Sequence, residues 1–253
     1  MIRRMLMIAL LCSGPLTACV AAQEEGRSSG PVAVTDRPAV PTGDAPYHAG
    51  GNEPFWSVKV VRRDLLLSRL NSEKLALTVS GVERSEVGAI TVTAGGRQVP
   101  SGVRLIRRSV LCHDSMTGMP HPETVRLILG ETVLTGCGGD PRDLLAGPDW
   151  QVHQINGQDM IETAQISLTF DPDGTTSGNG SCNRFRGRYD LTGEGLSFGR
   201  MATTRMACPA AAMKREGRVL EALKAVTRFD IDATGALLLL DGGKARIVAR
   251  SAD

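Results

Sequence analysis

Aromatic residues are scarce in this sequence, which has only two Trp, two Tyr and five Phe among its 253 residues. Glycine and proline are abundant instead, with 29 and 13 copies. This composition favours short strands joined by many turns over a helical bundle. A chain of this length is typical of one or two domains.

An excess of charge of either sign is also absent, because 29 Lys and Arg face 27 Asp and Glu. A nearly neutral chain has no general electrostatic attraction to nucleic acid, so we expect no nucleic-acid partner. The sequence has four His, no paired acid motif and no glycine loop that would cradle a phosphate. Because no nucleophile stands with a base and an orienting acid, we expect a protein that is not an enzyme and uses no cofactor or metal.

The apolar run near the start, Met5–Leu11, is much shorter than the about 20 apolar residues that a membrane span needs. It follows Arg3 and Arg4 and leads to a stretch of small residues. A basic start, an apolar centre and a small-residue end are typical of a secretory signal. We therefore expect a signal peptide at residues 1–18.

The end of this signal, Leu16-Thr17-Ala18-Cys19, resembles the bacterial lipobox. The resemblance implies that Cys19 carries fatty acyl chains such as palmitate and becomes the link to a membrane. Val20, rather than an aspartate, follows the cysteine, which implies the outer membrane, with the protein facing the periplasm. Residues 19–45 contain scattered Gly and Pro without apolar periodicity, so we expect a disordered tether.

Two blocks follow, at 46–147 and 148–253, separated by turn-rich sequence around Gly138-Gly139-Asp140-Pro141. Alternating or short apolar runs between turn residues predict β-strands in both blocks. In the first block we expect strands at Trp56–Val60, Lys74–Val79, Val87–Thr93, Val103–Ile106, Glu123–Leu129 and Thr132–Leu134. In the second block we expect them at Trp150–Ile155, Ile166–Phe170, Phe185–Leu191, Phe229–Ile231, Ala236–Leu240 and Ala245–Val248.

A single helix is predicted, after Pro209 in the second block. Val219, Ala222, Leu223 and Val226 recur at helical spacing and would form one apolar stripe laid on a sheet. Proline is tolerated at the first position of a helix, which suits Pro209.

Four of the six cysteines remain for the folded part, because Cys12 leaves with the signal and Cys19 is the expected lipid anchor. In an oxidising compartment Cys112, Cys137, Cys182 and Cys208 are best interpreted as two disulfides. Three pairings are possible. If the blocks fold separately, only Cys112–Cys137 and Cys182–Cys208 remain.

Two alternatives use the same region of the first block. One is a metal site formed by Cys112, His113, His121 and Cys137, although this spacing matches no compact zinc pattern. The other is an enzyme of unrecognised class that acts through Cys112, His113 and His121. Both need Cys112 in its reduced form.

Arg184, Arg186 and Arg188 alternate with Phe185, Gly187 and Tyr189. A strand would place the three guanidinium groups on one face, where they could bind a phosphate or carboxylate. The alternative is a solvated outer face without a ligand. Nearby, Asp171-Pro172-Asp173-Gly174 begins like a calcium loop but lacks the later ligands, so a hairpin turn is expected there.

The second block resembles the META domain family, the HslJ-like heat-shock proteins. The resemblance is carried by Phe170–Gly174, Ser177–Phe185, Leu196–Gly199 and Thr203–Pro209. It implies a small, partly closed antiparallel β-structure with one packed α-helix. It also implies a link to heat shock and novobiocin resistance, and it brings no catalytic residue to this chain.

The first block is similar to an uncharacterised domain of other bacterial envelope proteins. The similarity is carried by Gly51–Trp56, Cys112–Met116, Pro120–Pro122 and Leu134–Cys137. We therefore expect a mainly β protein with two small antiparallel β domains. Its expected function is that of an envelope lipoprotein, a non-enzymatic binding or protective module in stress or antibiotic tolerance. Its partner could be an envelope protein, an inhibited envelope hydrolase or a small apolar ligand.

Overall fold

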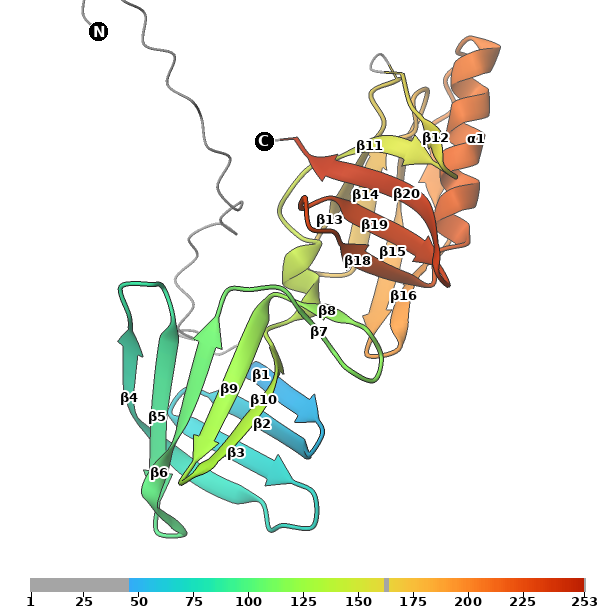
Figure 1. Cartoon of the computed structure of the whole chain (residues 1–253). Helices are drawn as coiled ribbons and strands as arrows, with labels where there is room; N and C mark the ends of the chain where they lie inside the picture. Colours follow the sequence, from blue (N-terminus) through green and yellow to red (C-terminus); the bar gives the residue numbers. More distant parts are fainter. Residues whose placement is uncertain (1–45, 162–163, 253) are drawn as a thin grey trace, which may run out of the picture. The chain divides into compact units, whose positions relative to one another are not determined.

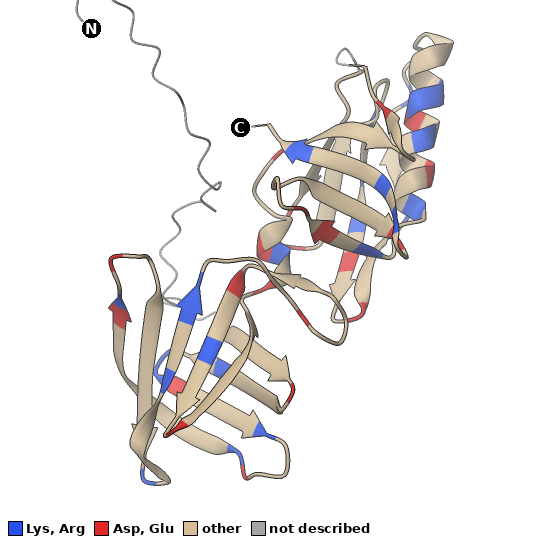
Figure 2. Cartoon of the chain, viewed as in Figure 1, with Lys and Arg blue, Asp and Glu red and all other residues tan. Residues whose placement is uncertain are grey.

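A computed structural model describes residues 46–161 and 164–252 (Figure 1). The expected signal at 1–18, Cys19 and the tether at 19–45 lie outside the described residues. The described chain is mainly β, as predicted, and its strands are antiparallel. Acidic and basic positions are interspersed along the ribbon (Figure 2), in keeping with the balanced composition.

The first group of strands forms a closed barrel with the order β1-β10-β9-β6-β5-β4-β3-β2. A separate two-stranded ribbon, β7 with β8, is inserted between β6 and β9. The barrel strands are β1 (Tyr47–Asn52), β2 (Phe55–Val61), β3 (Asp64–Arg69), β4 (Leu75–Arg84), β5 (Ile90–Gly96), β6 (Val99–Arg108), β9 (Glu123–Leu129) and β10 (Thr132–Gly138). The ribbon strands are β7 (Cys112–His113) and β8 (Pro120–His121).

Alternation of apolar and polar side chains sets the faces of the barrel strands. On β9, Val125 and Leu127 are fully buried while Arg126 between them is exposed. Leu65 on β3 and Leu105 on β6 pack into the same core, which also contains the indole ring of Trp56. Burial of this apolar surface is the main force that closes the barrel.

One charged cluster is buried with this core. Arg107 donates from Nε and Nη2 to the two carboxylate oxygens of Glu123, at 2.8 and 2.7 Å. Tyr47 donates its hydroxyl to Glu123 Oε2 at 2.8 Å, and the Arg107 guanidinium lies 3.7 Å from the centre of the Tyr47 ring. Burial and the nearby Glu123 carboxylate raise the pKa of Tyr47 far above its usual value, so its hydroxyl stays a donor.

The second group of strands forms one sheet with the path β16-β15-β14-β13-β11-β20-β19-β18. Two short strands pair at the side of this path, β12 with β11 and β17 with β15. The strands are β11 (Trp150–Ile155), β12 (Gln158–Asp159), β13 (Ser167–Phe170), β14 (Thr175–Asn179), β15 (Arg184–Thr192), β16 (Gly195–Phe198), β17 (Ala202–Thr203), β18 (Arg228–Ile231), β19 (Leu237–Asp241) and β20 (Lys244–Ser251). A 3-10 turn, η1 (Pro141–Leu144), precedes β11.

The two end strands of this sheet come close together. The backbone N–H of Leu196, on β16, donates to the carbonyl of Thr227 at 3.0 Å, just before β18 begins. The sheet is therefore curled until it is nearly closed, which agrees with the expected partly closed β-structure.

Helix α1 (Ala210–Lys224) lies against this sheet (Figure 1). The predicted stripe packs inward, because Val219, Ala222 and Leu223 are buried. Val226 is buried too, although it follows the last helical residue. Pro209 stands one position earlier than predicted, at the N-cap, where an extended ψ of 142° leads into the helix.

The turn between β13 and β14 is a hairpin turn, as predicted. Asp171 and Thr175 are joined by a backbone hydrogen bond of 2.8 Å, and Gly174 donates to the Asp171 carbonyl at 3.1 Å. Gly174 has a φ of +83°, which a glycine adopts without steric cost. Among residues 46–161 and 164–252, no helix has both the length and the apolar character needed to cross a membrane.

Candidate binding site

Strand β15 has the alternation predicted for the three arginines. Arg184, Arg186 and Arg188 are exposed, whereas Phe185 and Tyr189 are buried. The guanidinium groups therefore leave the strand on its solvent side, opposite the core. Successive side chains of a strand point to opposite faces, so the aromatic residues can pack into the core while the arginines face the solvent. The alternation in the sequence therefore favours a strand here.

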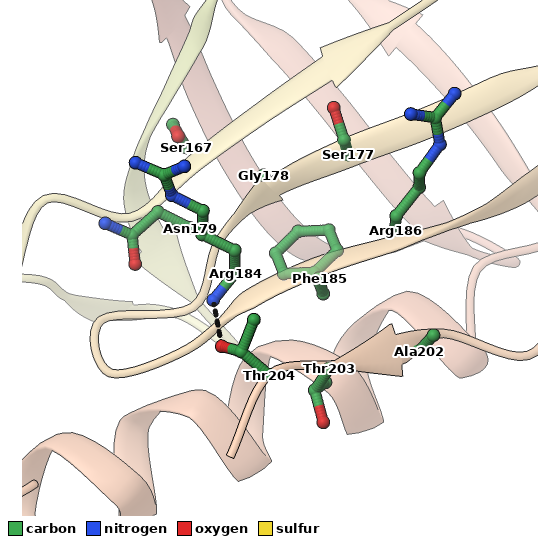
Figure 3. Close-up of a pocket in the computed structure, with 10 residues that line it drawn as sticks. All are labelled: Ser167, Ser177, Gly178, Asn179, Arg184, Phe185, Arg186, Ala202, Thr203 and Thr204. Atoms are coloured by element: carbon green, nitrogen blue, oxygen red, sulfur yellow. Dashed lines mark hydrogen bonds between the residues drawn. The ribbon is translucent and has the colours of Figure 1, made fainter. Parts of the chain in front are cut away.

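Arg184 and Arg186 line a groove on this solvent side, with a volume of about 710 Å³ (Figure 3). We call it the arginine groove. Apart from Phe185, its other lining residues are small or polar. They come from β13, β14, β15 and β17 and the residue after β17; with Phe185 they are Ser167, Ser177, Gly178, Asn179, Phe185, Ala202, Thr203 and Thr204. Each of these lining residues is neutral, so among the described residues the lining carries charge only on the two guanidinium groups.

The guanidinium groups of Arg184 and Arg186 make no hydrogen bond or ion pair within the part of the chain that the structure describes. An arginine fork carries several donors that are suited to the oxygens of a carboxylate or phosphate. The electrostatics of the groove thus favour an anionic ligand.

Arg188 does not line the groove, so the structure separates one of the three predicted arginines from the other two. Its Nη2 donates to the backbone carbonyl of Asp173 at 3.0 Å. Hydrogen bonds from Thr175, together with the charges of Arg188 and Arg186, hold the pKa of the Asp173 carboxyl below its usual value. Arg188 therefore lies with the turn at Asp173.

A buried polar network fixes the rim of the arginine groove. Asn183 is buried, and its backbone N–H and its side-chain Nδ2 both donate to Glu216 Oε2 on α1, at 2.8 and 3.0 Å. The Oδ1 of Asn183 accepts from the hydroxyl of Thr204 at 2.8 Å and from the backbone N–H of Met206 at 2.7 Å. The Thr204 hydroxyl in turn accepts from the N–H of Arg184 at 3.2 Å (Figure 3).

A disulfide crosses the same region, joining Cys182 to Cys208. One cysteine precedes Asn183 and the other follows Met206, so the covalent bond and the network hold the same two segments together. Gly178 permits the close packing beneath the groove, because a Cβ there would lie 2.0 Å from the Ser167 carbonyl oxygen. The backbone that carries Arg184 is thus held from several directions, which pre-organises the groove.

In the first block the motif residues come together at one region of the barrel. Cys112 is joined to Cys137, Asn52 donates to Asp114 Oδ2 at 2.9 Å, and the Trp56 indole N–H donates to the Thr135 carbonyl at 3.1 Å. These contacts link the Gly51–Trp56 motif with the two later cysteine motifs. These motif residues therefore have a structural role, because they join separate segments of the barrel.

The glycine before Cys137 belongs to the same junction. A Cβ on Gly136 would lie 1.9 Å from the carbonyl oxygen of Gly50, so only glycine lets the facing strands β1 and β10 approach this closely. This steric requirement is sufficient to explain the glycine of the Leu134–Cys137 motif, and no ligand needs to be invoked.

The residues of the metal and enzyme alternatives are found around this disulfide. Cys112 and Cys137 are bonded to each other, so neither offers the thiolate that a metal or a nucleophilic mechanism needs. His113 is exposed on β7, and His121 on β8 has its Nδ1 3.1 Å from the Gly139 carbonyl oxygen. Among residues 46–161 and 164–252 there is no group of three or more His, Cys, Asp or Glu placed to hold a metal ion.

The sequence indicates the arginines as candidate binding residues, but it does not indicate the other residues of the groove. Ser177, Asn179, Asn183 and Thr204 lie within the stretches that carry the META resemblance, yet they have no local pattern that indicates binding. Glu216 has no such signal at all, because its partner Asn183 is 33 residues away.

Comparison with known proteins assigns the part of the chain that contains the groove. Residues 143–253 match the family model of the META domain. This part of the chain is therefore a META domain, which confirms the predicted family for the second block. A structure described as the NMR structure of a protein from Burkholderia xenovorans is 32% identical, covering 44% of this chain and 86% of that one with a TM-score of 0.36. Comparison with curated proteins gives no match.

Proposed function

We propose that this protein is a non-enzymatic binding module of the bacterial envelope that acts in stress or antibiotic tolerance through the arginine groove of its META domain. The single observation that carries the proposal is the presence of Arg184 and Arg186 in a groove of about 710 Å³, where neither forms an ion pair with a carboxylate of the described residues. An anionic ligand is the occupant whose charge these groups match.

The domain organisation and the cellular location are part of the same proposal. The chain would consist of a signal at 1–18, a tether at 19–45 and β domains at 46–147 and 148–253, with Cys19 as its lipid anchor. The lipobox resemblance supports the anchor and the outer-membrane address. The similarity of the first block to envelope proteins supports the same compartment.

A change of Cys19→Ala tests the anchor. We expect the mature protein to leave the membrane fraction or to remain unprocessed, because no thiol is left to be acylated. Several acyl chains hold a protein firmly, since each buried methylene contributes about 0.8 kcal/mol. Membrane fractionation with mass spectrometry of the N-terminal peptide measures this. A wild-type protein that sediments with membranes while its Cys19 is unmodified would contradict the anchor.

A deletion strain tests the role in tolerance. We expect greater sensitivity to heat or to novobiocin, as the META family resemblance implies, and rescue by the wild-type gene. The double variant Arg184→Gln/Arg186→Gln should fail to rescue, because it removes the charge of the groove and leaves the core unchanged. Survival curves and immunoblots of protein level measure this.

Arg188→Gln is the matched control, since Arg188 lies on the same strand and face but outside the groove. It should rescue as well as the wild type does. Normal tolerance of the deletion strain, or full rescue by the double variant, would contradict the proposed function.

A further inference from the structure

The lining of the arginine groove contains the same arrangement twice, one row after the other. Across the β14–β15 pair, Arg184 stands opposite Asn179 and Arg186 stands opposite Ser177. On the next strand, Ser167 stands opposite Asn179. Each arginine thus has a neutral hydrogen-bonding side chain beside it on the same face of the sheet (Figure 3).

The spacing of the two rows follows from strand geometry. Residues two apart in a strand are separated by about 6.6 Å, at roughly 3.3 Å per residue. A ligand that engages both rows therefore needs two acidic groups about 7 Å apart along the direction of β15. Figure 3 shows the guanidinium groups of Arg184 and Arg186 well apart in the groove, so we expect each to engage an acidic group of its own.

The third arginine shows where this arrangement ends. Arg188 continues the same face of β15, but its guanidinium donates to the Asp173 carbonyl and lies near the Asp173 carboxylate. That carboxylate repels an acidic ligand. The turn at Asp173 therefore marks one end of the cationic track.

The groove offers charge and hydrogen bonds but no aromatic platform. Phe185 is its only aromatic lining residue and is 2% exposed, so its ring cannot stack with a ligand. Proteins that bind single-stranded nucleic acids rely on exposed aromatic rings for the bases. The exposed Thr203 at the rim adds a hydroxyl group, which suits a ligand that itself carries hydroxyls.

We propose that the arginine groove binds a linear, hydroxylated polyanion, of the kind found in acidic glycans and sugar or polyol phosphate polymers, with two neighbouring acidic groups held by Arg184 and Arg186. This inference rests on the proposed function and names the ligand class of the same site. Its specificity comes from the matched spacing of the two rows.

Binding to the full chain tests the ligand class, with isothermal titration calorimetry at low salt. An oligogalacturonate and a poly(glycerol phosphate) are the two probes, and they distinguish carboxylate from phosphate as the acidic group. Galacturonate and glycerol phosphate are the corresponding monomers, and a maltooligosaccharide is the neutral control. We expect one polymer to bind at least about tenfold more tightly than its monomer, because the polymer makes a second charge-assisted contact that the monomer cannot make.

Variants connect this binding to the groove. Arg184→Gln and Arg186→Gln should each weaken the polymer by about tenfold or more and bring its affinity toward that of the monomer. Arg104→Gln/Arg126→Gln is the matched control, because it removes two exposed arginines from the outer face of the barrel strands β6 and β9. This control variant should bind the polymer as the wild type does, and added salt should weaken binding in both.

The outcomes separate the ligand class from the proposed function. If monomers bind as tightly as polymers and the groove variants lose both, the polyanion is excluded while an anion-binding groove remains. If the barrel variant loses as much affinity as the groove variants, or an oligothymidylate binds more tightly than both polymers, the assignment of the groove to a hydroxylated polyanion is overturned. If no anion binds, both the ligand class and the proposed function of the groove as an anion-binding site are contradicted.

Discussion

Replacing Glu123 by alanine should lower the free energy of unfolding of the barrel by about 3–5 kcal/mol, the usual cost of leaving one member of a buried ion pair without its partner. Arg107 is 5% exposed, and its Nε and Nη2 both donate to Glu123. The variant would remove the carboxylate that the buried guanidinium contacts through two hydrogen bonds, and with it the acceptor of the Tyr47 hydroxyl.

Hydrogen–deuterium exchange measured peptide by peptide in increasing denaturant can follow this effect in the barrel strands separately from the META domain. The triple variant Tyr47→Phe/Arg107→Met/Glu123→Leu is the matched control, because it removes every member of the cluster and keeps the volume nearly constant. We expect it to be far less destabilised than Glu123→Ala, since apolar replacement of a whole buried ion pair is often close to neutral. A loss of less than about 1 kcal/mol for Glu123→Ala, the range of exposed ion pairs, would contradict the burial argument.

Removing the disulfide of the META domain should have an effect of similar size. Cys182 and Cys208 are 26 residues apart, and a loop of this length contributes about 3.5 kcal/mol in the chain-entropy model. We expect Cys182→Ala/Cys208→Ala to lower the stability of the META domain by about this amount. Exchange should rise first in the peptides that lead into β15 and into α1, because Cys182 and Cys208 lie just before these two elements.

The first disulfide provides the control for this experiment. Cys112 and Cys137 are 25 residues apart. The double variant Cys112→Ala/Cys137→Ala therefore removes a disulfide that closes a loop of nearly equal length in the barrel. Each double variant should destabilise mainly the strands that its own disulfide joins. Peptide mapping without reduction should first recover both bonds in the wild type, and a peptide that links Cys137 to Cys182 would contradict the pairing.

The strands that alternate clearly could be predicted from sequence. Glu123–Leu129 is predicted with the bounds that the structure gives to β9, because apolar and polar residues alternate along it. Strand β14 (Thr175–Asn179) was not predicted, since Thr, Ser, Gly and Asn provide no apolar alternation. It forms because its neighbours β13 and β15 supply the pairing and the core, which is a tertiary effect.

The candidate site was predictable to a similar extent. The alternation of Arg184, Arg186 and Arg188 with buried residues was visible in the sequence, since it depends on local spacing alone. The separation of Arg188 was not, because it depends on the turn at Asp173. Likewise, the hydrogen bond between Asn183 and Glu216 joins a strand to a helix and leaves no mark in either local sequence.

The closed barrel has a consequence for copies of this protein that are crowded together. An open sheet ends in a strand with unpaired N–H and C=O groups, which can recruit a strand from another molecule. In the barrel each strand from β1 to β6, and β9 and β10, is paired on both sides. Even at high local density, no barrel strand is therefore left unpaired along a whole side, and this limits the places from which an intermolecular sheet could grow.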